Sequence, residues 1–311
     1  MDDWWLISLA FLLSAVMRVV QKICSKKVSD EVKGKIFFHY GGYYNLCSAI
    51  LSLLVLFVAG FDGFDWPTVL CALATAVCMA IELFASIEAL KGASLIVTNM
   101  FSVGALFIPC IVGIFLFQEP MSIWQWFGLL LFFVSMYFLI APKKEKNKEK
   151  VKKISLKTLL MLILTVLAGG GTMVAQKTFA TLVVNGSVAE YSFLMFALNA
   201  VILYVCYFGT CCFEKVRTRG VEKSTPKKTS GLSKVLLVCG LILAVAVFVI
   251  NIIVTELGKT IDSAILFSVS YAIGILVTIL VGSLYYKEKI TGKNIIGIFL
   301  CVGSLAIINF L

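Results

Sequence analysis

The chain has 311 residues, of which 60% are hydrophobic and 14% charged, and its formal net charge at pH 7 is +10. An average soluble domain carries about 25% charged residues, so this composition excludes that class. The basic residues gather in loops that have no folded domain with base-stacking groups, a pattern that suits anionic lipid headgroups rather than nucleic acid.

Ten apolar segments follow one another along the chain, each of about 20 residues, which is enough to cross the hydrocarbon core of a bilayer as a helix. Lipid offers no partner for unpaired backbone groups, so each span is expected to be helical. No basic region precedes the first span, which we therefore expect to be retained rather than cleaved. The predicted fold is an all-α integral membrane protein. The ten spans cover residues 4–21, 36–60, 67–89, 92–116, 122–141, 157–179, 190–212, 232–256, 261–285 and 292–311.

A lysine-rich linker at 142–156 divides the chain into two halves of five spans, 1–141 and 157–311. Five is odd, so the second half must enter the membrane in the opposite orientation. Loop charges agree: 61–66 has no basic residue, whereas its counterpart 214–234 has seven. This swap predicts two inverted five-helix repeats. The lysine-rich loops are then expected in the cytoplasm and both termini outside.

Two acidic turns, 169 residues apart, occupy the same place in each half. Each glutamate precedes a hydroxyl residue, Ser122 or Thr291, that could cap the next helix. We expect these turns to shape the hairpins between spans 4–5 and 9–10 rather than to carry transport chemistry. The residues assigned to this structural role are Glu119, Gly128, Glu288 and Gly297.

These turns resemble a known family. Glu119-Pro120-x-Ser122-x-x-Gln125-x-x-Gly128 and Glu288-x-x-Thr291-x-x-Asn294-x-x-Gly297 are similar to the Glu-x-x-[Thr/Ser]-x-x-Gln-x-x-Gly signature of EamA-like repeats in the drug/metabolite transporter superfamily. The segment 170–177, Gly-Gly-Thr-Met-Val-Ala-Gln-Lys, resembles the first-helix pattern of the family, whereas the first half keeps Lys22 without the glycines. The resemblance covers essentially the whole chain and implies two EamA-like repeats, with export driven by a proton gradient. Family members are usually drawn with cytoplasmic termini, the reverse of the charge-based orientation.

Ionisable residues inside predicted spans are costly, and we single out two of them. Glu82, in span 3, is a candidate proton carrier or cation site, or else a structural partner of Arg18 or His39. Arg18, in span 1, could anchor an anion or extend to the interface. At the 169-residue offset Glu82 corresponds to Asn251 in span 8, so the repeat keeps polarity there but a carboxyl group in one half only.

Polar residues at repeat-related positions near the midplane are the default substrate region of such transporters. Span 2 contains an aromatic and polar stretch at 39–45, and its counterpart in span 7 ends at Asn199. The segment 98–102 of span 4 aligns with 267–271 of span 9. The same residue types could instead serve helix packing or an interfacial aromatic belt. The predicted substrate-lining residues are Arg18, Tyr43, Asn45, Asn99, Asn199, Asn251, Ser268 and Tyr271.

Lys22 and Lys177 each follow a glutamine near the end of the first span of a half. A lysine kept on both sides does not follow the orientation rule. It could cap a helix end, the alternative we favour, or meet an anionic group.

The sequence offers little for other functions. The ten cysteines show no Cys-x-x-Cys spacing and there is one histidine, so neither a metal site nor a cofactor is expected. Gly169-Gly170-Gly171 lacks the Gly-Lys-[Ser/Thr] ending of a nucleotide-binding loop. Without clustered acids an enzyme is not expected.

The function predicted from the sequence is secondary active transport of small organic metabolites or drugs at the plasma membrane, by alternating access and with proton coupling. The expected partners are the lipid bilayer, the solute and protons. The alternatives are a flippase for lipid-linked substrates and a membrane scaffold or sensor that transports nothing. The sequence does not specify the oligomeric state.

Overall fold

The computed structural model describes residues 35–61, 63–90, 104–119, 121–140, 155–183, 186–218, 233–269 and 292–310, with four isolated positions at 12, 13, 16 and 101. Within these ranges the regular structure is helical, and none of the described residues lies in a strand. The predicted all-α class is therefore confirmed.

The helices described begin and end close to the predicted spans. Spans 2, 3, 5, 6, 7, 8 and 10 each correspond to one helix, whereas span 1 and much of spans 4 and 9 lie outside the described residues. A further short helical stretch occupies 263–269. The labelled helices are α2 (Lys35–Ala59), α3 (Trp66–Leu90), α5 (Phe107–Leu116), α6 (Ile123–Ile140), α7 (Leu156–Leu182), α8 (Val188–Thr218), α9 (Lys234–Leu257) and α11 (Gly292–Phe310).

Five of these helices (α2, α3, α7, α8 and α9) are long and apolar enough to cross a membrane, by length and composition. The apolar helices α5, α6 and α11 contribute shorter segments. Large apolar side chains such as Phe57 and Val58 are exposed on the outer faces. A lipid environment suits this arrangement, because such extensive apolar exposure is unusual for a soluble monomer.

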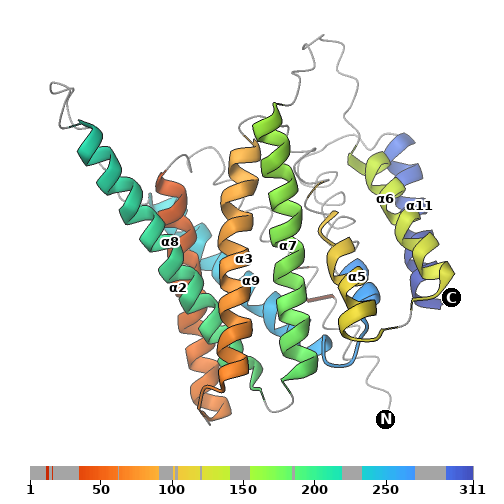
Figure 1. Ribbon diagram of the computed structural model, residues 1–311, viewed down its shortest axis with the longest axis horizontal. Helices are drawn as coiled ribbons and strands as arrows, with labels where there is room; N and C mark the ends of the chain where they lie inside the picture. The colour runs from red at the N-terminus through yellow and green to blue at the C-terminus, as the bar shows by residue number, and fades with distance from the viewer. Residues whose placement is uncertain are drawn as a thin grey trace.

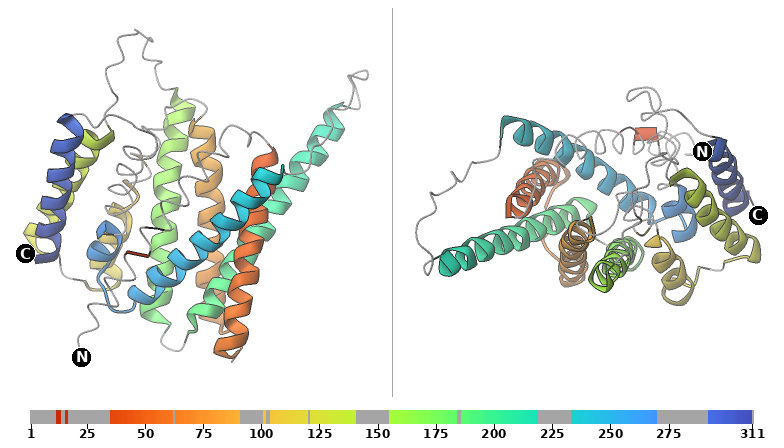
Figure 2. Two further views of the ribbon diagram at one scale, coloured as in Figure 1. Left: turned by 180° about the vertical axis from the view of Figure 1, so that it is seen from behind. Right: turned by 90° about the horizontal axis from the view of Figure 1, so that it is seen from above.

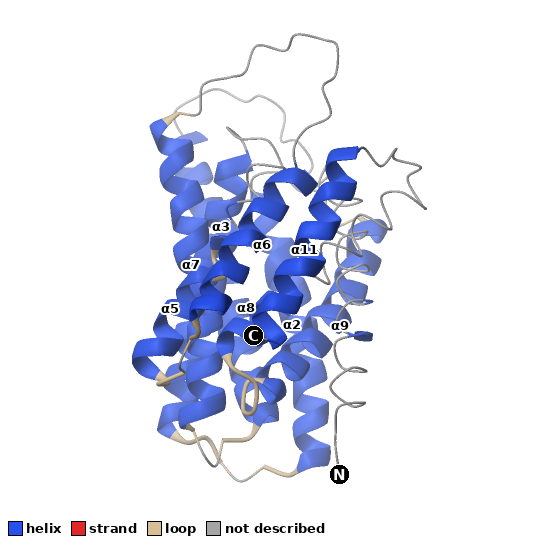
Figure 3. Cartoon of the chain, turned by 90° about the vertical axis from the view of Figure 1, so that its right-hand side faces the viewer, coloured by secondary structure: helices blue, strands red, loops and turns tan. Residues whose placement is uncertain are grey.

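The helices pack in pairs that join distant parts of the chain. Helix α2 lies along α8, α3 along α7, and α6 along α11 (Figure 1). Seen from behind, helix α9 crosses obliquely in front of α2 and α3 (Figure 2). The α6–α11 pair stands at one side of the bundle, beyond α5, as the side view also shows (Figure 3).

A buried tyrosine joins three of the long helices. Tyr191 of α8 is fully buried, and its ring stacks on Phe179 of α7 with the ring centroids 4.2 Å apart. Its hydroxyl shares a 2.8 Å hydrogen bond with the Thr75 hydroxyl of α3. Aromatic stacking with a satisfied polar group fixes the mutual positions of these helices.

Local capping follows the repeated motif. The Ser122 hydroxyl accepts a hydrogen bond from the Gln125 backbone N–H at 3.1 Å, and the Gln125 side chain accepts from the Ser122 N–H at 3.0 Å. This reciprocal pair is a capping box, so Ser122 caps α6 as the sequence predicted. The Gln125 amide also donates to the Ile308 carbonyl of α11 at 3.4 Å.

Helices α6 and α11 approach closely at Gly128. A Cβ atom at this position would lie 2.7 Å from Ile308 Cγ1 and 3.1 Å from the Ser304 carbonyl oxygen. Gly128, which we expected to shape the hairpin, thus lies inside α6 and limits its distance from α11. Gly297, its counterpart in α11, is also buried.

We expect Gly128→Ala to destabilise the protein by about 1–3 kcal/mol, because the added methyl group overpacks the α6–α11 contact. Thermal unfolding in detergent measures the change. Gly303→Ala in α11 is the matched control, since a Cβ there meets no atom within 4 Å. Equal effects of the two substitutions would contradict close packing at Gly128.

Candidate functional site

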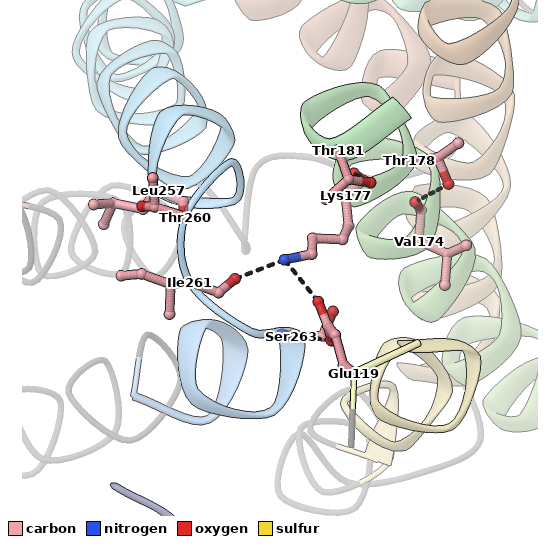
Figure 4. Close-up of polar contacts among 9 residues, drawn as sticks. All are labelled: Glu119, Val174, Lys177, Thr178, Thr181, Leu257, Thr260, Ile261 and Ser263. Carbon is pink, nitrogen blue, oxygen red and sulfur yellow. Dashed lines mark hydrogen bonds and ion pairs between the residues drawn. The ribbon is translucent and has the colours of Figure 1, made fainter. Parts of the chain in front are cut away.

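A buried ion pair joins the two halves of the chain. The Lys177 Nζ atom of α7 lies 2.9 Å from Glu119 Oε1, and the two side chains are 3% and 13% exposed. Lys177 also donates a 2.6 Å hydrogen bond to the Ile261 carbonyl, in the turn that follows α9 (Figure 4). We call this arrangement of Glu119, Lys177 and Ile261, together with Ser263, the clamp.

Glu119 reaches the clamp because its turn folds back on α5. Gln118 adopts φ 53°, a left-handed conformation uncommon outside glycine. The Glu119 N–H then donates to the Gly113 carbonyl at 3.1 Å. Gly113 leaves room for the carboxylate, since a Cβ there would lie 2.6 Å from Glu119 Oε2.

The same carboxylate binds a backbone donor of the second half. Glu119 Oε2 accepts a 3.0 Å hydrogen bond from the Ser263 N–H, where the 263–269 helix begins. We expected Glu119 to shape its hairpin; it also contacts α7 and the 263–269 helix, which was not predicted. Charge-assisted hydrogen bonds of this kind are stronger than neutral ones.

Lys177 meets an anion, which was the less favoured of the two alternatives from the sequence. Its ammonium binds the Glu119 carboxylate and the carbonyl of Ile261. Glu119 lies in the turn after α5 and Ile261 in the turn after α9, so Lys177 does not cap its own helix. The Lys177 ammonium also lies 6.0 Å from the centroid of the Phe117 ring.

An outer cavity of about 330 Å³ lies beside the clamp. Its lining includes Gln118, Thr181, Thr260 and Asp262 in addition to the two clamp charges. Lys259 lines it too, and pairs with Glu256 at 2.9 Å in a partly exposed contact.

An inner cavity of about 150 Å³ lies further along α7. Glu82 of α3 and Asn251 of α9, the two positions related by the 169-residue offset, both line it. Two of the residues that we predicted to carry transport chemistry are therefore brought to one cavity. The rest of the lining is Gly169, Thr172, Met173, Gln176, Val247, Ile250, Val254 and Phe267.

The two cavities follow each other along α7. Gly169 and Gln176 line the inner cavity, whereas Lys177 and Thr181 line the outer one. Lys177 is eight residues beyond Gly169, or about 12 Å along a helix. The buried ion pair is therefore in the wall of the outer cavity, and its lysine directly follows the last α7 residue of the inner cavity.

Gln176 organises the wall of the inner cavity, and the sequence did not single it out. Its amide nitrogen donates to the Thr255 hydroxyl at 2.7 Å and to the Asn251 carbonyl at 3.3 Å. The Asn251 side chain in turn accepts from the Ser192 hydroxyl at 3.2 Å. The one sequence signal was a glutamine inside an otherwise apolar span.

The remaining predicted substrate residues within the described ranges make packing contacts. The Asn199 amide of α8 donates to Asn45 of α2 at 3.2 Å, and both are buried. The Tyr43 hydroxyl donates to the Leu237 carbonyl at 3.3 Å, and the Ser268 hydroxyl to that of Ile265 at 3.2 Å. None of these four lines either cavity. Arg18, Asn99, Tyr271 and Glu288 lie outside the described residues.

Comparison with known proteins gives a fold but no family. No family model matches the chain, and no curated protein matches it. A solved structure described as "Crystal structure of protein" superposes with a TM-score of 0.72 over 97% of this chain and 96% of its own, at 15% sequence identity. At this identity the similarity establishes a shared fold alone.

Among the described residues, no group of three or more histidine, cysteine, aspartate or glutamate side chains could hold a metal ion. The polar groups that the structure brings together are those of the clamp and of the inner cavity. Their chemistry is the binding of charge and of hydrogen-bonding solutes.

We expect Lys177→Met to destabilise the protein by about 3–5 kcal/mol, because it leaves the buried Glu119 carboxylate without its cation. Unfolding in detergent measures the loss. Lys259→Met is the matched control: its pair with Glu256 is partly exposed, so its loss costs less than about 1 kcal/mol. The double variant Glu119→Gln/Lys177→Met should be more stable than Lys177→Met alone, and a less stable double variant would contradict the ion pair.

Proposed function

We propose that the protein is a secondary transporter that carries small organic solutes across the plasma membrane by alternating access. One observation carries this proposal: a partly polar cavity inside a bundle of apolar helices lies next to an outer cavity whose wall contains a buried ion pair. Ionisable residues among apolar helices commonly mark the path of a substrate or ion. The clamp then closes one end of that path.

Alternating access in the proposal comes from two inverted repeats within a ten-helix protein. Helices α2 and α8 occupy corresponding places in the two halves, as do α6 and α11. Each of these pairs packs together, as helices beside a pseudo-two-fold axis in the membrane plane would. The similarity to a solved structure over nearly the full chain shows that both halves belong to one shared fold.

Opening of the outer end requires the clamp to separate. Glu119 belongs to the first half and Lys177, with Ile261 and Ser263, to the second. A relative movement of the halves would therefore pull the carboxylate from both its ammonium and its backbone donor. Restoring those contacts would close the outer cavity again and leave the inner cavity for loading from the other side.

Coupling to protons is assigned to Glu82. It is the carboxyl group of the inner cavity, and a carboxyl that alternates between two sides can carry a proton with it. The resemblance to EamA-like repeats favours export. The lysine-rich loops then lie in the cytoplasm and the termini outside.

We expect Glu82→Gln to abolish the part of solute flux that depends on a pH gradient. The measurement is uptake of a panel of labelled solutes into proteoliposomes, with and without an imposed gradient. Glu256→Gln is the control, since this glutamate is half exposed in a surface pair. Gradient-driven flux that survives in Glu82→Gln would refute the coupling role, and a protein that moves no solute under any condition would refute transport.

The orientation can be tested by labelling single cysteines in a cysteine-free background. We expect Phe61→Cys, in the exposed turn between α2 and α3, to react with an impermeant maleimide in intact cells. Asn147→Cys, in the lysine-rich linker, should react only after permeabilisation. The reverse pattern would overturn the assigned orientation.

A further inference from the structure

The Glu82 carboxyl group belongs to the lining of the inner cavity. Among the described residues, none forms an ion pair or a hydrogen bond with it, and none of those that line this cavity is basic. A carboxylate among apolar helices normally needs a cation or a proton beside it. A cationic ligand would supply the charge that the described residues do not.

Gly169 of α7 leaves room for the Glu82 carboxyl group. A Cβ atom at Gly169 would lie 3.2 Å from both Cδ and Oε1 of Glu82. The bare face of α7 thus lets the carboxyl group fit between α3 and α7 at van der Waals distance. A larger residue at 169 would have to displace it.

The other polar groups of the cavity also present acceptors. The Gln176 amide nitrogen is engaged with Thr255 and the Asn251 carbonyl, which leaves its own oxygen for a ligand. The Thr172 hydroxyl donates its hydrogen bond to the Ala168 carbonyl at 3.1 Å, so its oxygen can only accept from a ligand. A ligand that suits these oxygens brings several N–H donors, as an ammonium group with its three hydrogens does.

The remaining wall sets the size and character of the ligand. Met173, Val247, Ile250, Val254 and Phe267 make it apolar. A cavity of about 150 Å³ matches one known to hold benzene. A bare metal cation suits this wall poorly, because hard cations take six or more oxygen ligands.

We propose that the inner cavity binds a small primary ammonium ion with a short apolar body, its charged group on Glu82 and its body against the ring of Phe267. The inference rests on the proposed transport function and names its substrate class.

Binding of benzylammonium to the purified full-length protein in detergent tests the proposal. Isothermal titration at neutral pH compares it with benzyl alcohol and benzoate, which share its ring but are neutral and anionic. We expect benzylammonium to bind at least about tenfold more tightly than either. Equal binding of the three, or preference for benzoate, would overturn the proposal, as would displacement of benzylammonium by millimolar sodium.

Variants locate the site. Glu82→Gln should lower benzylammonium affinity at least about tenfold and leave benzyl alcohol binding unchanged. Gly169→Ala should also weaken benzylammonium, while Gly209→Ala, whose Cβ meets no atom within 4 Å, should not. If Glu82→Gln does not fold, Glu82→Asp replaces it: the shortened carboxylate should bind benzylammonium more weakly than the parent. Unchanged affinity in both Gly169→Ala and the folded Glu82 variant would overturn the assignment.

Flux separates this inference from the proposed function. Proteoliposomes are tested with labelled benzylammonium, and the leak of its neutral form is measured in protein-free liposomes and subtracted. Benzylammonium flux above this leak that Glu82→Gln abolishes supports both claims. Glu82-dependent binding without any flux would leave the site standing and overturn transport. Flux of neutral or anionic solutes, with no binding of benzylammonium, would overturn the substrate class and leave transport standing.

Discussion

The ion pair between Glu119 and Lys177 is the constraint on which the arrangement of the two halves depends. Neither charge can stay unpaired among apolar helices, because the desolvation of a single charge costs several kcal/mol. The pair is buried at 2.9 Å, and the carboxylate holds the Ser263 N–H as well. A turn of the first half is therefore fixed to α7 and to the 263–269 helix.

Close helix approach is the second constraint, and glycine provides it. Apolar side chains gain little by packing together in lipid, so helix association relies on small residues and hydrogen bonds. Gly169 contacts the Glu82 carboxyl group and Gly171 contacts the Cys78 sulfur. Gly170 lies so close to Ile108 that a Cβ atom would not fit. Three consecutive glycines of α7 thus bring α3 and α5 against it. In α6, Gly128 does the same for α11.

Hydrogen-bonding residues in these helices divide into two groups. Asn45 and Asn199 bond to each other and are buried, so they hold α2 against α8. Glu82, Gln176 and Asn251 face a cavity instead. The same residue types thus pack against neighbouring helices in one place and line a cavity in the other, and the difference is the space beside them. The described residues of that cavity wall come from α3, α7 and α9, with Phe267 of the 263–269 helix.

The sequence by itself determined the all-α class, the bounds of seven spans and the Ser122 cap, because these follow from hydropathy, length and contacts within a few residues. It also related Glu82 to Asn251 through the 169-residue offset, and both residues line the inner cavity. Only the tertiary structure decided the partner of Lys177, because Glu119 lies 58 residues away in sequence. Hydropathy predicts spans, but it does not predict which charged side chains form a pair. The same holds for Gln176, and for Asn45 and Asn199, which were predicted to line the substrate site but bond to each other. Whether a polar side chain meets a cavity or a neighbour depends on the space left when helices pack, and that space is a property of the whole bundle.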